Sequence, residues 1–415
     1  MQRLPALARL AAGASILLCS GHVAAAPITL EQALQRAVGR PLVALAGASA
    51  EAARHDADQA SLSAYNPQVT VGAGPRFVGD QRWIAFQVGL GHTFQLGGKR
   101  SARRAAADAR IDVADAERFA AGLIARIETW RAFQLALVVR ERVAMAMEAE
   151  EVAIQVEAAT RVRKDVGFGT QLELNLTTAE VGRARHDRLD AERTYTAAVA
   201  ALASAIGARP TEVIEPSGTL APTPALTADT EALIARALRD RPEARSALAS
   251  SRAARAEIRV ADADAVPDVT LGVSYSYERD PDLTANAVLA TASIGLPLLN
   301  RNQGTRRAAR SLADRAEIQV SWTTIEIERE IRVAVSGYQR AREAVLGFDK
   351  EVNERLHENL ELARASYTSG KIDYFQFNVV RRELLASRNA YLDAFEETIE
   401  AWTAVQRATG GGGVP

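Results

Sequence analysis

An internal repetition constrains the fold of this chain most, because the second half repeats the order of motifs in the first half. Four motifs return 200 to 203 positions later: Arg40-Pro41, residues 66–72, Gly169 and Gly207 return as Arg241-Pro242, residues 266–272, Gly370 and Gly410. Each half has the pattern helix, strand, strand, very long helix, turn, long helix. The sequence therefore predicts two copies of one folding unit, joined by a short proline-rich linker.

The N-terminus has the features of a secretory signal peptide. Two arginines precede an apolar run at 10–18, and Ala24-Ala25-Ala26 forms a small-residue cleavage site. The run is much shorter than the roughly 20 residues of a membrane-spanning helix. The predicted organisation is a signal peptide at 1–26, a first repeat at 27–209, a linker at 210–226, a second repeat at 227–410 and a flexible tail at 411–415.

Cys19 is the only cysteine, and it lies in this predicted leader. Lipidation of Cys19 is an alternative, but the large Leu18 stands where such processing usually requires a small residue. If the leader is removed, disulfides and thiolate metal sites are excluded. The chain carries 50 basic and 51 acidic residues, so it has no basic excess that would favour a nucleic acid partner.

Each half contains one very long predicted helix. Residues 101–166 include a single glycine and no proline, and residues 305–369 are the counterpart in the second half. A helix of this length extends on the order of 100 Å. Such helices need partners along their length, so we expect coiled coils or a helical barrel. A cytosolic coiled coil is the alternative, and the leader argues against it. Turns at 165–170 and 367–373 reverse each helix into a long hairpin.

Four segments alternate apolar and polar residues with a period of two, as β-strands do. These segments are Val69–Ala73, Ile84–Phe94, Val269–Tyr277 and Val288–Leu296. Most approach the length of transmembrane β-strands, about 9 to 11 residues. Four strands cannot close a barrel, and open strand edges are not tolerated in lipid, so a membrane location requires an oligomer. A four-stranded soluble sheet is the alternative, but no other segment is available to cover its apolar face.

The order of these motifs resembles the outer-membrane efflux proteins, the TolC-like channels. The resemblance rests on Thr29-Leu30-Glu31-Gln32-Ala33-Leu34, on Arg241-Pro242-Glu243 and on the turns at Gly169 and Gly370, and it covers nearly the whole chain after the leader. The segment 95–100, Gln-Leu-Gly-Gly-Lys-Arg, looks like the branch that exports heavy-metal cations of the cobalt–zinc–cadmium type.

This resemblance implies a mainly α fold with a small β part. It implies a homotrimer with a shared twelve-stranded transmembrane β-barrel, four strands per chain, and a long α-helical barrel in the periplasm. The implied location is the outer membrane, and the implied partners are outer-membrane lipid, a periplasmic adaptor (membrane fusion) protein and a proton-driven inner-membrane efflux pump. The implied function is passive export of small solutes, with heavy-metal cations favoured and drugs or secreted proteins as alternative cargo. A periplasmic adaptor and a structural coiled-coil protein are the alternatives from other classes.

No catalytic, cofactor or metal site is expected from the sequence. Gly97-Gly98-Lys99 departs from a phosphate-binding loop at two required positions, so we interpret it as a tight passage from strand to helix. His357-Glu358 lacks the second histidine of a zinc-protease helix, and the other histidines show no metal-ligand spacing.

Three groups of residues are instead candidates for channel function. Carboxylates beside the hairpin turns are predicted to line the periplasmic aperture: Asp165, Glu173 and Asp373. Residues of the turns are predicted to contact the adaptor: Gly167, Phe168, Gly169, Thr170, Ser369, Gly370, Lys371 and Asp373. Aromatic residues near the strand ends are predicted to form a girdle at the lipid headgroups: Phe77, Trp83, Tyr275 and Tyr277. Solvated helix ends and ordinary strand aromatics are the respective alternatives. Gln376 and Asn378 stand where related channels often carry gate carboxylates, so the gate is expected to be weaker or built differently.

Overall fold

The computed structural model describes residues 26–411 apart from 210, 280–283 and 349, and it does not describe the side chains of residues 26, 78, 83 and 350–357. The signal peptide, Cys19, residues 412–415, the loop at Asp280-Pro281 and the side chains of Trp83 and His357 therefore lie outside the described part.

The two halves contain the same succession of elements, with one exception. The first half comprises β1 (Ala26–Ile28), α1 (Leu30–Ala37), α2 (Pro41–Ala60), β2 (Gln68–Val78), β3 (Gln81–Phe94), α3 (Lys99–Asp165) and α4 (Gln171–Ala205). The second half comprises β4 (Ile214–Pro216), α5 (Thr230–Asp240), α6 (Pro242–Ala263), β5 (Val269–Arg279), β6 (Thr284–Ile294), α7 (Gln303–Gly347), α8 (Lys350–Thr368) and α9 (Tyr374–Thr409). The exception is that two helices, α7 and α8, stand in the second half where the first half has α3 alone. β1 pairs in parallel with β4, which ties the start of the first half to the linker.

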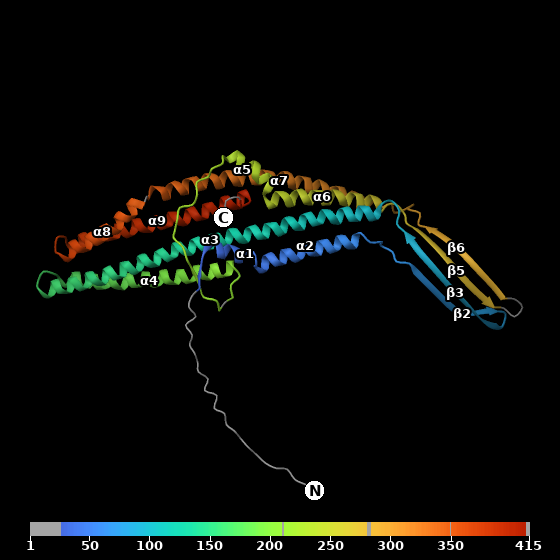
Figure 1. Ribbon diagram of the computed structural model, residues 1–415, viewed down its shortest axis with the longest axis horizontal. Coiled ribbons are helices and arrows are strands. Elements are labelled where there is room, and N and C mark those ends of the chain that lie inside the picture. The colour runs from blue at the N-terminus through green and yellow to red at the C-terminus, as the bar shows by residue number, and fades with distance from the viewer. Residues whose placement is uncertain (1–25, 210, 280–283, 349, 412–415) are drawn as a thin grey trace, which may run out of the picture.

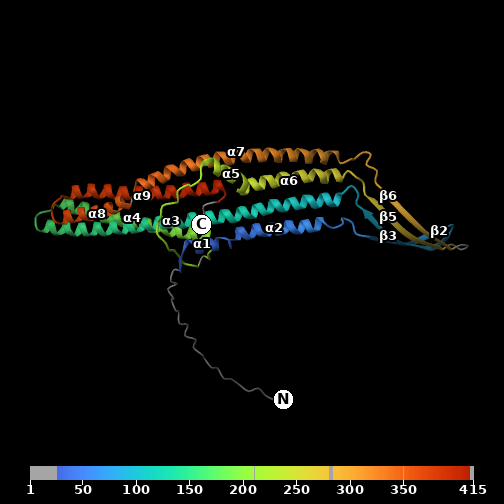
Figure 2. The ribbon, with the colours of Figure 1, turned by 45° about the horizontal axis from the view of Figure 1, so that its top comes forward.

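The chain forms a long rod with a four-stranded sheet at one end and two helical hairpin tips at the other (Figure 1). The sheet is antiparallel in the order β2-β3-β5-β6. Each strand is joined to one helix, so α2, α3, α6 and α7 lie side by side in the same order, as both views show (Figures 1 and 2). Strands β2 and β6 are the edges of the sheet, and α2 and α7 are the edges of the helical layer.

The strand register separates the two faces of the sheet. Val71, Val88 and Tyr275 stand opposite one another on β2, β3 and β5, while Thr70, Gly89 and Ser274 form the neighbouring polar row. The rows Val69–Leu90–Val273 and Phe94–Val269–Ile294 continue the apolar face. The alternation expected from the sequence is therefore confirmed, and the apolar face contains many exposed large hydrophobic side chains.

Two element boundaries differ from the sequence prediction. Strand β2 continues past Pro75 to Val78, because β2 is an edge strand in which a missing backbone N–H is tolerated. The long helix predicted at 305–369 is divided between α7 and α8. Gly347 ends α7, and Phe348 leaves the helical conformation with φ −97° and ψ 73° while its ring packs edge-on against Tyr391. A glycine at this point weakens the helix, and the aromatic contact favours the departure.

Two of the repeated motifs meet at the middle of the rod. Arg40-Pro41 begins α2 directly beside Gly207 at the end of α4, and Arg241-Pro242 begins α6 beside Gly410 at the end of α9. Proline suits the first turn of a helix because its missing N–H would have no helical partner there. Gly410 adopts φ +78°, and a Cβ added there would come within 3.2 Å of the Arg241 Cα, so glycine suits this close approach. The Arg-Pro motif and the glycine that follows the last helix of each half thus mark one helix junction, built twice.

Candidate pore ends and docking tips

The first hairpin tip joins α3 to α4 through a glycine turn. Gly167 adopts φ +87°, and the Phe168 N–H donates to the Arg163 carbonyl at 2.8 Å, which closes the end of α3. The Phe168 side chain is 80% exposed at the extremity of the rod. A Cβ at Gly169 would lie 2.9 Å from the Lys164 nitrogen, so the turn also requires glycine at this position. The tip therefore presents a bulky apolar side chain on a tightly constrained loop.

Both tips begin their returning helix with the same capping box. At α4, Thr170 Oγ1 accepts from the Glu173 N–H at 3.1 Å, and a Glu173 carboxylate oxygen accepts from the Thr170 N–H at 2.8 Å. At α9, Asp373 accepts from the Gln376 N–H at 2.8 Å, and Gln376 accepts from the Asp373 N–H at 3.1 Å. Each box satisfies backbone donors that would otherwise lack partners. Glu173 and Asp373 thus stabilise the first turn of the returning helix at each tip.

The predicted aperture residues lie at the same end of the molecule but play different local roles. Asp165 is the last residue of α3, and its side chain is exposed. Asp165 is not a member of either capping box. Asp373 is exposed and Glu173 is half-buried. The predicted docking residues Ser369, Gly370 and Lys371 are exposed on the second tip. All of these residues therefore gather around the two tips, which lie together at one end of the rod (Figure 1).

A buried tyrosine joins the second tip to α3. The Tyr367 hydroxyl lies 2.6 Å from Thr160 Oγ1, and Thr160 donates to the Val156 carbonyl, so Tyr367 is the donor in their contact. The Arg163 guanidinium lies over the Tyr367 ring at 5.1 Å from its centroid. The ring also packs against Phe377 on α9. Tyr367 therefore connects α3, α8 and α9 just below the tips.

A largely buried ion pair joins the two hairpins a few turns from their tips. Arg381 on α9 and Glu180 on α4 approach within 2.5 Å, and their side chains are only 5% and 12% exposed. Arg381 also donates to the Asn378 side chain at 3.2 Å. The pair lies beside a groove of about 510 Å³ between α4 and α9. It is thus a direct side-chain link between the returning helices of the two halves, which sequence periodicity did not reveal.

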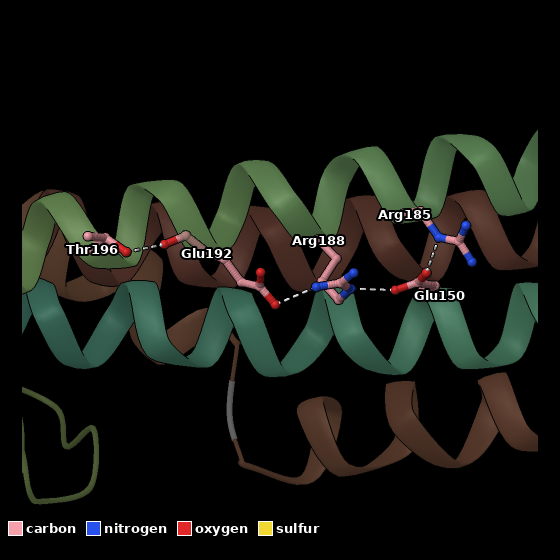
Figure 3. A network of polar contacts seen from close by, with 5 residues as sticks. All are labelled: Glu150, Arg185, Arg188, Glu192 and Thr196. Atoms are coloured by element: carbon pink, nitrogen blue, oxygen red, sulfur yellow. Dashed lines mark hydrogen bonds and ion pairs between the residues drawn. The ribbon is translucent and has the colours of Figure 1, made fainter. Parts of the chain in front are cut away.

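Within the first hairpin, charged side chains clamp α4 onto α3 (Figure 3). Glu150 on α3 accepts from Arg185 at 2.9 Å and from Arg188 at 2.5 Å, and Arg188 also pairs with Glu192. The hydrogen bonds from Arg185 and Arg188 lower the pKa of Glu150 below its usual value, although burial opposes this shift. The Thr196 hydroxyl donates to the Glu192 backbone carbonyl and completes the row.

At the other end of the helices, Lys99 anchors the passage from sheet to helix. Its ammonium group lies 2.7 Å from Asp268, which also accepts from the Tyr65 hydroxyl at 3.0 Å. Burial opposes ionisation of Asp268, but the bonds from Lys99 and Tyr65 together lower its pKa. Gly97 and Gly98 both adopt φ +72°, which allows the turn that places Lys99 there. The structural interpretation of Gly97-Gly98-Lys99 is therefore confirmed.

Among the candidate girdle residues with described side chains, Phe77 lies near the end of β2 that is remote from the helices, whereas Tyr277 and Tyr275 lie opposite Phe86 and Val88, nearer the middle of the sheet. Phe77 is exposed beneath the Arg82 guanidinium, which lies 5.3 Å from the ring centroid. Tyr277 and Tyr275 both pack against Phe86, at 5.7 and 6.1 Å between centroids. The Tyr275 hydroxyl lies 2.9 Å from the Asn286 side-chain oxygen. These aromatics share the apolar face of the sheet, as an aromatic girdle would require.

The described residues contain no cluster of three or more His, Cys, Asp or Glu side chains that could hold a metal ion. Among the helices of residues 26–411 that the structure describes, none is both long enough and apolar enough to cross a membrane.

Comparison with known proteins decides the family. The model of the outer membrane efflux protein family matches residues 29–208 and 233–411, which is most of the chain and both halves. The chain belongs to the outer membrane efflux protein family. It is therefore an outer-membrane efflux channel protein of the kind that works in tripartite systems, and it is not an enzyme. This confirms the family expected from the sequence.

Individual relatives agree with this assignment. The chain is 25% identical over 410 residues to the cobalt-zinc-cadmium resistance protein CzcC of Cupriavidus metallidurans, covering 98% of this chain and 95% of CzcC. The outer membrane protein VceC of Vibrio cholerae superposes with a TM-score of 0.72 at 20% identity, covering 93% of this chain and 97% of VceC. The outer membrane channel CmeC of Campylobacter jejuni gives 0.76 at 16% identity, covering 92% and 86%. The chain thus has the TolC-like fold predicted for it.

Proposed function

We propose that three copies of this chain form a closed duct that spans the outer membrane and extends into the periplasm, and that the duct passively exports small solutes. The four-stranded sheet is the main observation that supports this proposal. Its β2 and β6 edges have no partner among the described strands, and its apolar face is open to solvent in the single chain. Only closure with sister chains satisfies these edges in lipid.

The polar face of the sheet is suited to a water-filled lumen. It carries Thr70, Ser274 and Ser276 together with small glycines, and Arg76 forms an ion pair with Glu278 across the strands. With three copies, the twelve strands enclose a lumen wide enough for a hydrated solute. The apolar face then contacts lipid. Phe77 lies in the headgroup region, while Tyr277 and Tyr275 face lipid at the levels of residues 73 and 71 of β2.

The helical hairpins form the periplasmic extension of this duct. In our proposal Asp165, Glu173 and Asp373 surround the periplasmic aperture, where a ring of carboxylates favours cations. The exposed turns at Gly167–Thr170 and Ser369–Asp373 contact the adaptor, and the adaptor connects the duct to an inner-membrane pump. The exposed Phe168 supports this role, since a bulky apolar side chain on a rigid turn makes a suitable anchor.

For the cargo we favour heavy-metal cations. The full-length likeness to CzcC, a cobalt-zinc-cadmium resistance protein, supports this choice. The described residues hold no candidate metal cluster, which suits a duct whose selectivity lies in its pump. Drugs are the second candidate cargo. The fold does not distinguish between cargoes, because several outer-membrane channels of low sequence identity share it.

The cargo is tested by deleting this gene and measuring growth inhibition by cobalt, zinc, cadmium and a panel of drugs. We expect sensitivity to the three cations and rescue by the wild-type gene. Drug sensitivity with unchanged metal tolerance would contradict the metal assignment and leave the channel assignment standing. Conductance in planar bilayers tests the aperture: Asp373→Asn should change divalent-cation block, and Asp393→Asn on the same helix, remote from the tips, is the matched control.

A further inference from the structure

The internal duplication extends to individual ion pairs between helices. Arg40 on α2 pairs with Glu128 on α3 at 3.0 Å, and Arg241 on α6 pairs with Glu330 on α7 at 2.7 Å. Further along, Arg54 pairs with Asp115 at 2.8 Å and Arg255 pairs with Glu317 at 2.6 Å. In both cases the arginine of the second pair lies 201 positions after the arginine of the first, and the carboxylate residue lies 202 positions after its counterpart. The pair α6–α7 therefore repeats the interhelical ion pairs of the pair α2–α3.

The contact between the two halves supplies a second type of helix junction, α3 against α6. Here Ala116 on α3 and Ala249 on α6 line the same part of the contact and are 8% and 4% exposed. The Arg245 guanidinium on α6 lies over the Phe119 ring on α3 at 5.5 Å, and Arg110 pairs with Glu257 at 2.5 Å. At this junction the small Ala116 and Ala249 meet at the centre, and the larger Phe119 of α3 and Arg245 of α6 stack beside them.

The same duplication identifies a matching junction that the single chain leaves open. On α7 the counterparts of Ala116, Ala120 and Leu123 are bulky and exposed: Ile318 is 70%, Trp322 is 56% and Ile325 is 59% exposed. On α2 the counterparts of Arg245, Leu248 and Ala249 are small and accessible: Ala44, Gly47 and Ala48. At these positions the open face of α7 is bulky and the open face of α2 is small, so the two faces are complementary in shape.

We infer that Ile318, Trp322 and Ile325 on α7 of one copy pack against Ala44, Gly47 and Ala48 on α2 of the next copy. The occupant is a second copy of this chain, because α2 and α7 are the two edges of one layer and repeat the partners of the α3–α6 junction. The inference rests on the proposed function, since it names the seam that closes the proposed duct. Trp322 buries the largest apolar surface at this seam.

The charges at this seam differ from those at the α3–α6 junction, which is the template for the seam within the chain. The loose pair Asp112–Arg252 of the α3–α6 junction corresponds to Asp314 and Glu51, and Arg110–Glu257 corresponds to Leu312 and Asp56. The opposite charges of the template are absent at the seam, so its attraction comes from apolar burial. Assembly through this seam should therefore persist at high salt, because screening weakens only the electrostatic contribution.

Cysteine crosslinking in the intact protein tests the seam, in a background that carries Cys19→Ser. The template pair Ala116–Ala249 maps to Ile318 and Ala48, so Ile318→Cys with Ala48→Cys should form crosslinks between copies and give dimer and trimer bands on a denaturing gel. The matched control combines Ile318→Cys with Ser49→Cys. Ser49 is equally accessible, but one residue rotates the side chain about 100° around the helix axis. The counterpart of Ser49 is Ser250, which borders the template contact beside Ala116, so we expect the control to crosslink more weakly than the pair with Ala48.

Two results overturn the inference. Equal crosslinking of both pairs, or stronger crosslinking at Ser49, shows that another face of α2 meets α7. If native mass spectrometry still finds trimers in that case, the channel proposal stands and only the seam is wrong. A protein that is monomeric in every detergent, without crosslinks, refutes both. Trp322→Ala gives an independent readout: we expect a clear loss of trimer, whereas Phe375→Ala at an exposed tip position should leave the trimer unchanged.

Discussion

Removing Arg381 tests whether side-chain links hold the two hairpins together near their tips. Breaking a buried ion pair by deleting one partner costs about 3 to 5 kcal/mol, because the remaining charge stays buried without compensation. Glu180 keeps 12% of its side chain exposed and retains a second partner, Arg183 at 3.1 Å, so we expect a smaller cost of about 1.5 kcal/mol for Arg381→Met. The Met side chain retains the length of the arginine stem, which limits any additional loss of packing.

Hydrogen exchange of the protein in detergent measures this cost locally. A loss of about 1.5 kcal/mol corresponds to roughly tenfold faster exchange at protected amides of α9 near Arg381. The double variant Glu180→Gln with Arg381→Met removes both charges, so its exchange should return to within about threefold of the wild-type rate. Exchange in Arg381→Met that stays within threefold of wild type, or a double variant that exchanges faster than either single variant, would refute the account of this link.

Three further changes test other contacts. Tyr367→Phe removes the hydrogen bond to the buried Thr160 hydroxyl and should cost about 1 kcal/mol in the opening free energy of α8, measured by hydrogen exchange. Glu150→Gln removes a carboxylate whose pKa is lowered in the folded state; its stabilising contribution is present at neutral pH and is lost as the pH falls through that lowered pKa. The melting temperatures of variant and wild type should therefore differ at pH 7 and converge in acid, and a constant difference would contradict this. Gly97→Ala forces a Cβ into a left-handed conformation and to within 2.7 Å of Val266, so a markedly lower melting temperature is expected, whereas an unchanged value would exclude strain at this turn.

Much of the fold could be predicted because the informative signals are local. Alternation along each strand fixed which residues share a face of the sheet, and the register confirms it. Gly167, Gly169 and Gly370 marked the two tips, and Gly167 and Gly370 adopt the left-handed backbone conformation that ends a helix there and that few other residues adopt. The repeated Arg-Pro motif marked the helix junctions, although its closeness to Gly207 and Gly410 emerged only from the structure.

The side-chain links between helices could not be predicted in the same way. Alanine-rich helices expose no single apolar stripe, so their sequence does not determine which face of each helix packs against its neighbours. Arg381 and Glu180 lie on different hairpins, 201 residues apart, and nothing local to either residue indicates the other. Glu173 and Asp373 were predicted as aperture carboxylates, but their capping roles depend on backbone geometry at the first turn of each helix. Their part in the aperture stays a prediction.

The central claim is that the sheet completes its hydrogen bonding only with sister chains in a membrane. Native mass spectrometry of the protein extracted from outer membranes measures this directly through the number of copies released from detergent micelles. We predict three copies that remain associated until the protein is heated in denaturant. A folded monomer that stays in solution after all detergent is removed would contradict the claim, because its open strand edges and apolar sheet face would then need no partner.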